Sequence, residues 1–143
     1  FLLVRRPGRV LQPRTVMLYG IISGLGFGIW EGVAYQLGIN RSQDVDHAYF
    51  LNVLRLTSLP FIHAVWAGIS SYFIGFSMLI PKLRWSLRIL AILIPATLYA
   101  AHNAFPGFVS VMVDLLSVVL LMSYLGNGQA LFSGMRRSNQ NTP

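Results

Sequence analysis

The sequence predicts an all-α fold, a polytopic helical membrane bundle of about four transmembrane helices that forms part of a larger bundle. The chain has 143 residues, of which 55% are hydrophobic and only 10% are charged. An average soluble domain carries roughly 25% charged residues, so this composition disfavours a soluble core. The apolar residues also fall into about four runs of the length that a bilayer core of about 30 Å requires. The chain contains no cysteine, which excludes disulfides and thiolate metal sites.

The first transmembrane span is predicted at residues 16–38. Glycines recur there at every fourth position and share one helix face, where a neighbouring helix can approach closely. These glycines are Gly20, Gly24, Gly28 and Gly32. The basic segment before the span, residues 1–15, begins with an apolar stretch that resembles the end of an earlier helix. We therefore expect further sequence upstream, removed by processing or truncation.

Three further spans are predicted at residues 58–80, 87–105 and 108–125. A polar loop of residues 39–57 precedes them, and Pro106-Gly107 forms a tight turn between the last two. The tail is polar and is expected to be mobile. The expected division is a basic cytoplasmic segment (1–15), a four-helix transmembrane domain (16–125) and a polar cytoplasmic tail (126–143).

The charge pattern predicts how the chain sits in the bilayer. Its net charge is +7, which in a soluble protein would suggest nucleic acid as a partner. Here the basic residues lie beside the spans and fall on one side of the bilayer if the spans alternate. They are Arg5, Arg6, Arg9, Arg14, Lys82, Arg84, Arg88, Arg136 and Arg137. We therefore expect both ends to be cytoplasmic, contacts with anionic lipid headgroups and no nucleic-acid partner.

Several polar residues fall inside the predicted spans, where an ionisable group costs roughly 2.5 kcal/mol or more at the bilayer centre. They are Glu31, His63, His102, Asn103 and Asp114. A helix rise of about 1.5 Å per residue places them in one layer, in the outer half of the membrane. Structural alternatives stay open: Glu31 could be protonated or bonded between helices, Asn103 could cap its helix, and Asp114 could pair with Arg55 or a histidine.

A carboxylate and two histidines suit zinc, which takes imidazole nitrogen and carboxylate oxygen as ligands and leaves one position for water in catalytic sites. Bound zinc produces a hydroxide near neutral pH that can attack a peptide carbonyl. The candidate ligands are Glu31, His63 and His102. They come from separate helices rather than from one compact motif, so the pattern is only moderately specific.

Three segments carry a resemblance to a known family. They are "GLGFGIWEGVAYQ", "RLTSLPFIHAVWAGISSYFIG" and "LYAAHNAF". Together they resemble the PrsW family of intramembrane proteases, distant relatives of the CAAX-prenyl and bacteriocin-processing membrane endopeptidases. Phe27 and Glu31 look like the family's FxxxE motif, and Arg55 with His63 looks like its R…H…G segment. The family's HxxxN motif is matched at Asn103, while Tyr99 stands at the histidine position and His102 lies on the same face.

The resemblance implies hydrolysis of a peptide bond in a membrane-anchored protein, such as an anti-sigma factor, in a bacterial cell membrane. It implies that Glu31 and His63 are catalytic and bind the metal with His102. Supporting roles would fall to Asn103, Tyr99, Arg55 and Asp114. The outer-half depth places cleavage near the extracytoplasmic side. The resemblance gives no oligomeric state.

One departure from the family pattern keeps other functions open. The family's paired-glutamate motif, EExxK, precedes FxxxE, and no acidic residue precedes Glu31 in this sequence. The chain is then either a fragment or an inactive relative that binds a membrane partner through the same groove. A small proton-coupled transporter using the same polar residues is a third hypothesis, although the inverted repeats that would support it are not found.

Overall fold

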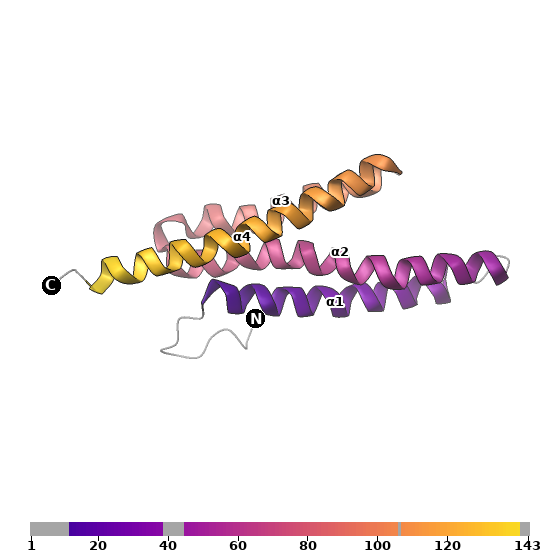
Figure 1. Ribbon diagram of the computed structural model, residues 1–143, viewed down its shortest axis with the longest axis horizontal. Helices are drawn as coiled ribbons and strands as arrows, with labels where there is room; N and C mark the ends of the chain where they lie inside the picture. The colour runs from indigo at the N-terminus through magenta and orange to yellow at the C-terminus, as the bar shows by residue number, and fades with distance from the viewer. Residues whose placement is uncertain (1–11, 39–44, 106, 141–143) are drawn as a thin grey trace.

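The computed structural model describes residues 12–38, 45–105 and 107–140, and this part of the chain is an all-α bundle without strands (Figure 1). In chain order its elements are α1 (Pro13–Leu37), α2 (Val45–Leu79), the short 3₁₀ helix η3 (Pro81–Leu83), α3 (Arg84–Ala104) and α4 (Phe108–Gln140). Four segments are long and apolar enough to cross a membrane: Pro13–Leu37, Leu56–Leu79, Pro81–Ala104 and Phe108–Gly128. The predicted fold class is confirmed.

Two helices are longer than the predicted spans. α2 begins at Val45, inside the segment predicted as a polar loop, and α4 continues to Gln140 through most of the predicted tail. Hydropathy marks the part of a helix that crosses a membrane rather than the helix ends. Neither added segment contains a proline, so nothing in the backbone stops either helix where its hydropathy falls.

The central element is α2, which packs against each of the other long helices. Its apolar window is 61% buried, against 33% for α1 and 11% each for α3 and α4. The buried core is therefore built mainly on α2, with single residues from its neighbours. Its members are Met17, Ile62, Val65, Trp66, Ile69, Tyr72, Phe73, Phe76, Ala91 and Leu121.

The glycine face of α1 lies directly against α2, as predicted. A Cβ atom on Gly24 would lie 2.4 Å from the carbonyl oxygen of His63, and one on Gly28 would lie 2.5 Å from Cα of Pro60. Both contacts are with backbone, which cannot swing away as a side chain can. The missing Cβ atoms thus let α1 approach the α2 backbone at the very residue, His63, that carries a candidate site side chain.

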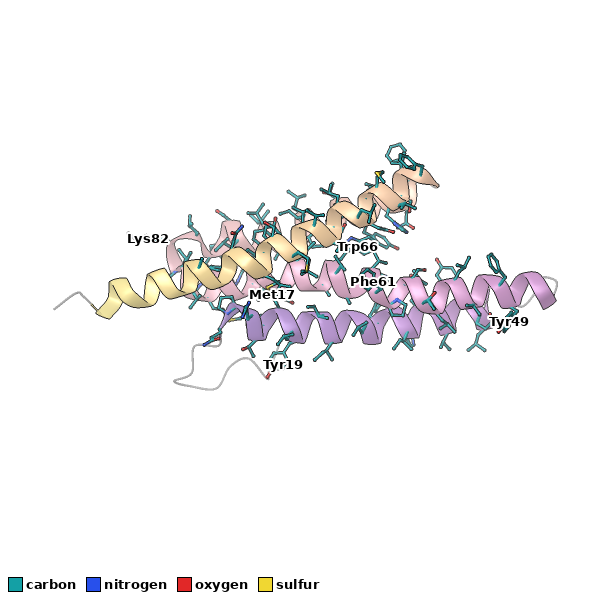
Figure 2. The ribbon with its side chains drawn as sticks, viewed as in Figure 1. Met17, Tyr19, Tyr49, Phe61, Trp66 and Lys82 are labelled. Atoms are coloured by element: carbon teal, nitrogen blue, oxygen red, sulfur yellow. The ribbon has the colours of Figure 1, made fainter. Side chains whose placement is uncertain are left out.

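A buried hydrogen bond joins α2 to α4. The indole Nε1 of Trp66 donates to Oγ of Ser117 at 3.1 Å, and the Ser117 hydroxyl donates to the carbonyl of Val113 at 2.8 Å. Ser117 is fully buried, and Trp66 lies between the two helices (Figure 2). The serine therefore satisfies the one polar atom of a large core side chain.

Replacing this serine should destabilise the bundle. Ser117→Ala leaves the buried indole N–H without an acceptor, and we expect a loss of about 1–3 kcal/mol in the free energy of unfolding. Equilibrium unfolding in mixed micelles measures it. Thr97→Ala is the matched control, since this exposed hydroxyl donates only to the Leu93 carbonyl of its own helix. Equal stability of the two variants would show that the Trp66 bond contributes nothing.

Candidate functional site

Glu31 on α1 and His63 on α2 form the more enclosed of two acid–histidine pairs in the described residues. Oε2 of Glu31 lies 2.5 Å from Nε2 of His63, and the two side chains are 20% and 12% exposed. Phe27, one turn before Glu31, presents its ring to the His63 ring at 5.0 Å and an angle of 74°. Residues four apart share a helix face, so the FxxxE spacing brings both the phenyl ring and the carboxylate to the same imidazole.

The Oε2 atom of Glu31 is buried and has no hydrogen-bond partner in the described part of the chain. The His63 contact is short in distance, yet its direction is not that of a hydrogen bond. A buried polar atom without a partner costs free energy, and such atoms are uncommon in folded proteins. This oxygen therefore has a lone pair available for a proton donor or a metal ion.

Aromatic rings enclose the imidazole of His63. Trp66 lies edge-on to it at 5.5 Å, and Tyr99 of α3 lies at 6.3 Å. Trp66 also contacts Tyr99 and His102, in both cases edge-on at 5.5 Å. The rings cover part of the imidazole, which is 12% exposed, and their low polarity strengthens any electrostatic interaction at the pair.

His102 belongs to a second polar cluster, between α3 and α4. Its Nδ1 lies 2.8 Å from Oδ1 of Asp114 and 2.9 Å from Oγ of Ser110. A serine–histidine–aspartate relay needs the serine and the acid on opposite ring nitrogens, so this cluster is not a nucleophile triad. A carboxylate at Nδ1 instead favours the tautomer with the proton there, and Nε2 is then a lone-pair atom.

The predicted site residues thus divide between two neighbouring clusters. Glu31 pairs with His63 and His102 pairs with Asp114, while Tyr99 contacts the first histidine. Within the described residues, no group of three histidine, aspartate or glutamate side chains could hold a metal ion. The geometry therefore does not place His102 in a three-ligand set with the first pair.

Asn103 and Arg55 complete the predicted set. Nδ2 of Asn103 donates to the backbone carbonyl of Tyr99 at 2.9 Å, within its own helix, and the residue is exposed. This bond agrees with the structural reading of Asn103 at a helix end. The side chain of Arg55 lies outside the part of the structure that is described. Its supporting role stays a prediction.

Trp66 and Ser110 are not among the site residues predicted from the sequence. The structure gives Trp66 contacts with both site histidines and places Ser110 on His102. The only available signals were spacings: Trp66 follows His63 by three residues, and Ser110 precedes Asp114 by four, so each shares a helix face with its neighbour. Such spacings are too common to identify a site.

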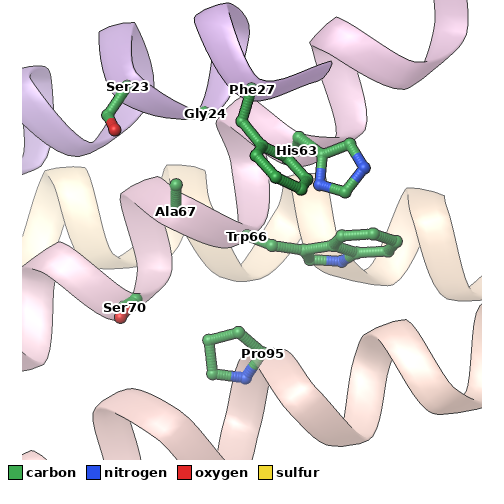
Figure 3. A pocket seen from close by; sticks show the side chains of 8 residues that line it. All are labelled: Ser23, Gly24, Phe27, His63, Trp66, Ala67, Ser70 and Pro95. Atoms are coloured by element: carbon green, nitrogen blue, oxygen red, sulfur yellow. The ribbon is translucent and has the colours of Figure 1, made fainter. Parts of the chain in front are cut away.

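A pocket of about 310 Å³ opens beside His63 (Figure 3). It lies between α1, α2 and α3, and its walls carry both apolar and hydroxyl side chains. The lining residues are Ser23, Gly24, Phe27, His63, Trp66, Ala67, Ser70 and Pro95. The imidazole of the first cluster thus borders a space that can receive a ligand.

Comparison with known proteins gives one match. A family model described as "PrsW family intramembrane metalloprotease" matches residues 1–126. No curated protein and no solved structure gives a significant match. The matched range includes both polar clusters and every residue that lines the pocket.

Proposed function

The chain belongs to the PrsW family of intramembrane metalloproteases, as its motifs suggested, and from this we propose that Glu31 and His63 form its reactive centre. The chain is an integral membrane protein whose family acts as membrane-embedded proteases. The proposed reaction is hydrolysis of a peptide bond in a membrane-anchored protein, with an anti-sigma factor as one candidate. We also propose a bacterial cell membrane from the resemblance and cytoplasmic ends from the charge pattern. The depth of the polar residues supports cleavage near the extracytoplasmic side.

The observation that carries the proposal is the unpaired buried oxygen of Glu31 beside the imidazole of His63. A carboxylate in this position can take a proton from water while the water oxygen bonds to the carbonyl carbon. The same proton can then pass to the leaving nitrogen as the carbon–nitrogen bond breaks. Aromatic rings fix the position of His63. Its Nε2 lies beside the Glu31 carboxylate and orients the reacting groups.

The family description implies a metal, and the pair fits part of a metal site. It offers a carboxylate oxygen and an imidazole nitrogen, donor types that zinc takes, but two side chains are fewer than zinc's usual three or four protein ligands. We propose that zinc binds Nε2 of His63 and one carboxylate oxygen of Glu31, while the other Glu31 oxygen takes the proton. His102 is paired with Asp114 and would have to turn from that partner to become the further imidazole. When bound, the metal would lower the pKa of its water and polarise the carbonyl.

The test uses the purified full-length protein in proteoliposomes with a panel of single-span reporter proteins. Each reporter, including one built on an anti-sigma factor span, carries a different tag on each side of the membrane. We expect cleavage in or near the span, at least about 10-fold slower after chelation and restored by added zinc. Metal content is measured on the same sample. Cleavage of no reporter by metal-loaded protein would overturn the proposed function, and cleavage unaffected by chelation would overturn the metal assignment.

A further inference from the structure

The pocket beside His63 lies over α2, between α1 and α3. Both of these helices pack on α2 but make little or no contact with each other, so the pocket is a gap between them with α2 as its floor. Gly24 has no side chain and Ala67 has only a methyl group, so neither fills the pocket. Pro95 lines it on the α3 side. Its volume of about 310 Å³ lies at the small end of ligand-binding sites.

Two hydroxyl groups in this pocket, like those of Thr15, Ser71 and Ser86 outside it, make no hydrogen bond with a described residue. Five other hydroxyls donate to a carbonyl of their own helix, a common arrangement for serine and threonine in membrane spans. Those that do so are Thr57, Ser58, Ser77, Thr97 and Ser117. Ser23 of α1 and Ser70 of α2 make no hydrogen bond with any described residue. Both therefore have a donor and lone pairs available to a ligand.

The hydroxyls lie at one end of the pocket and the imidazole at the other, with Ala67 between them (Figure 3). Ser70 follows His63 by seven residues, or about 10 Å along the α2 axis. An extended peptide covers that distance in about three residues, at roughly 3.3 Å each. Inside a bilayer such a peptide must find partners for its backbone N–H and C=O groups. A lipid acyl chain has no such groups and would leave both hydroxyls unpaired.

We propose that this pocket binds about three extended residues of the substrate, that their side chains are small, and that Ser23 and Ser70 hydrogen-bond their backbone. The inference rests on the proposed proteolytic function, because it assigns to that site the substrate positions beside the cleaved bond. Small side chains are required because three residues must share a pocket of about 310 Å³.

Binding is measured without hydrolysis, so that it is independent of catalysis. Trp30→Phe and Trp85→Phe leave Trp66 as the single tryptophan, at the pocket wall, and Glu31→Gln prevents turnover. The probe is a synthetic leucine-rich transmembrane peptide with central Ala-Gly-Ala and a bromine-bearing residue beside it. We expect it to quench Trp66 fluorescence, and replacing both serines with alanine to weaken binding about 5- to 100-fold, the effect of two hydrogen bonds.

Two comparisons make the result specific. Ser58→Ala removes a hydroxyl that bonds its own helix and should leave binding unchanged. A peptide with central Leu-Leu-Leu should bind at least about 10-fold more weakly because it overfills the pocket. Equal binding of both peptides, or no effect of the serine substitutions, would overturn the inference. It would also be overturned if brominated lipid quenched Trp66 and the peptide did not relieve that quenching. Serine-dependent binding without cleavage by the wild type would sustain the pocket assignment and overturn only the proteolytic function.

Discussion

Glu31→Gln is expected to lower the rate of peptide-bond hydrolysis at least ~100-fold, because an uncharged amide cannot accept the proton of the attacking water. Glutamine keeps the size and the hydrogen-bonding shape of the side chain. The buried oxygen that faces His63 is therefore replaced without opening a cavity. The helical content and unfolding midpoint should stay close to those of the wild type. The measurement is kcat on a cleaved single-span reporter, with circular dichroism on the same preparation.

Asp114→Asn is the matched control for this result. It makes the same acid-to-amide change at the other carboxylate that contacts a histidine within the spans. Because Asp114 lies in the second cluster, we expect its loss to lower kcat by less than about 10-fold, through the orientation of His102. Full inactivation by Asp114→Asn together with an active Glu31→Gln variant would transfer the reactive centre to the second cluster.

Gly24→Ala should damage both stability and activity, because it forces apart the two helices that carry Glu31 and His63. The added Cβ would fall 2.4 Å from the His63 carbonyl oxygen and 2.7 Å from Cα of Ala64, so α1 and α2 must separate. Overpacking of this kind costs about 1–3 kcal/mol, and the contact with backbone favours the upper part of that range. The separation also displaces His63 from Glu31, and a misplacement of about 1 Å can lower catalysis by about 100-fold.

Gly26→Ala is the control on the same helix. A Cβ at Gly26 meets no atom within 4 Å, and alanine is the better helix former, so stability should be unchanged or slightly higher. Equilibrium unfolding and reporter cleavage are measured for both variants. If the two glycine variants were equally stable and active, the close contact between α1 and α2 at His63 would not be required.

The main features of this fold could be predicted from the sequence because hydropathy and small-residue spacing act locally. The glycine repeat of α1 predicted its packing face, and that face contacts α2 as expected. The helix ends were harder to predict from the sequence. Helices α2 and α4 continue past their apolar windows into polar sequence, where no proline stops them. The sequence also could not show that α2 becomes the central helix, because its span is no more apolar than the others although it is the most buried.

The candidate site was also predicted only in part from the sequence. The sequence placed Glu31 and His63 in one candidate ligand set, and the structure brings these two side chains together. The separation of His102 into its own cluster depends on where the Trp66 ring lies, which no spacing specifies. The free hydroxyls of Ser23 and Ser70 also could not be predicted, because a sequence does not show which serines bond their own helix.

Each acid within the described spans contacts a histidine on a helix adjacent in the chain: Glu31 of α1 meets the following helix α2, and Asp114 of α4 meets the preceding helix α3. The two contacts therefore close two successive hairpins. During synthesis, each hairpin can leave the insertion machinery with its acid already beside a partner, so no lone carboxylate has to cross into lipid. The order of the helices along the chain thus favours stepwise assembly in the membrane, with docking of the two hairpins through Trp66 and Ser117 as the later event.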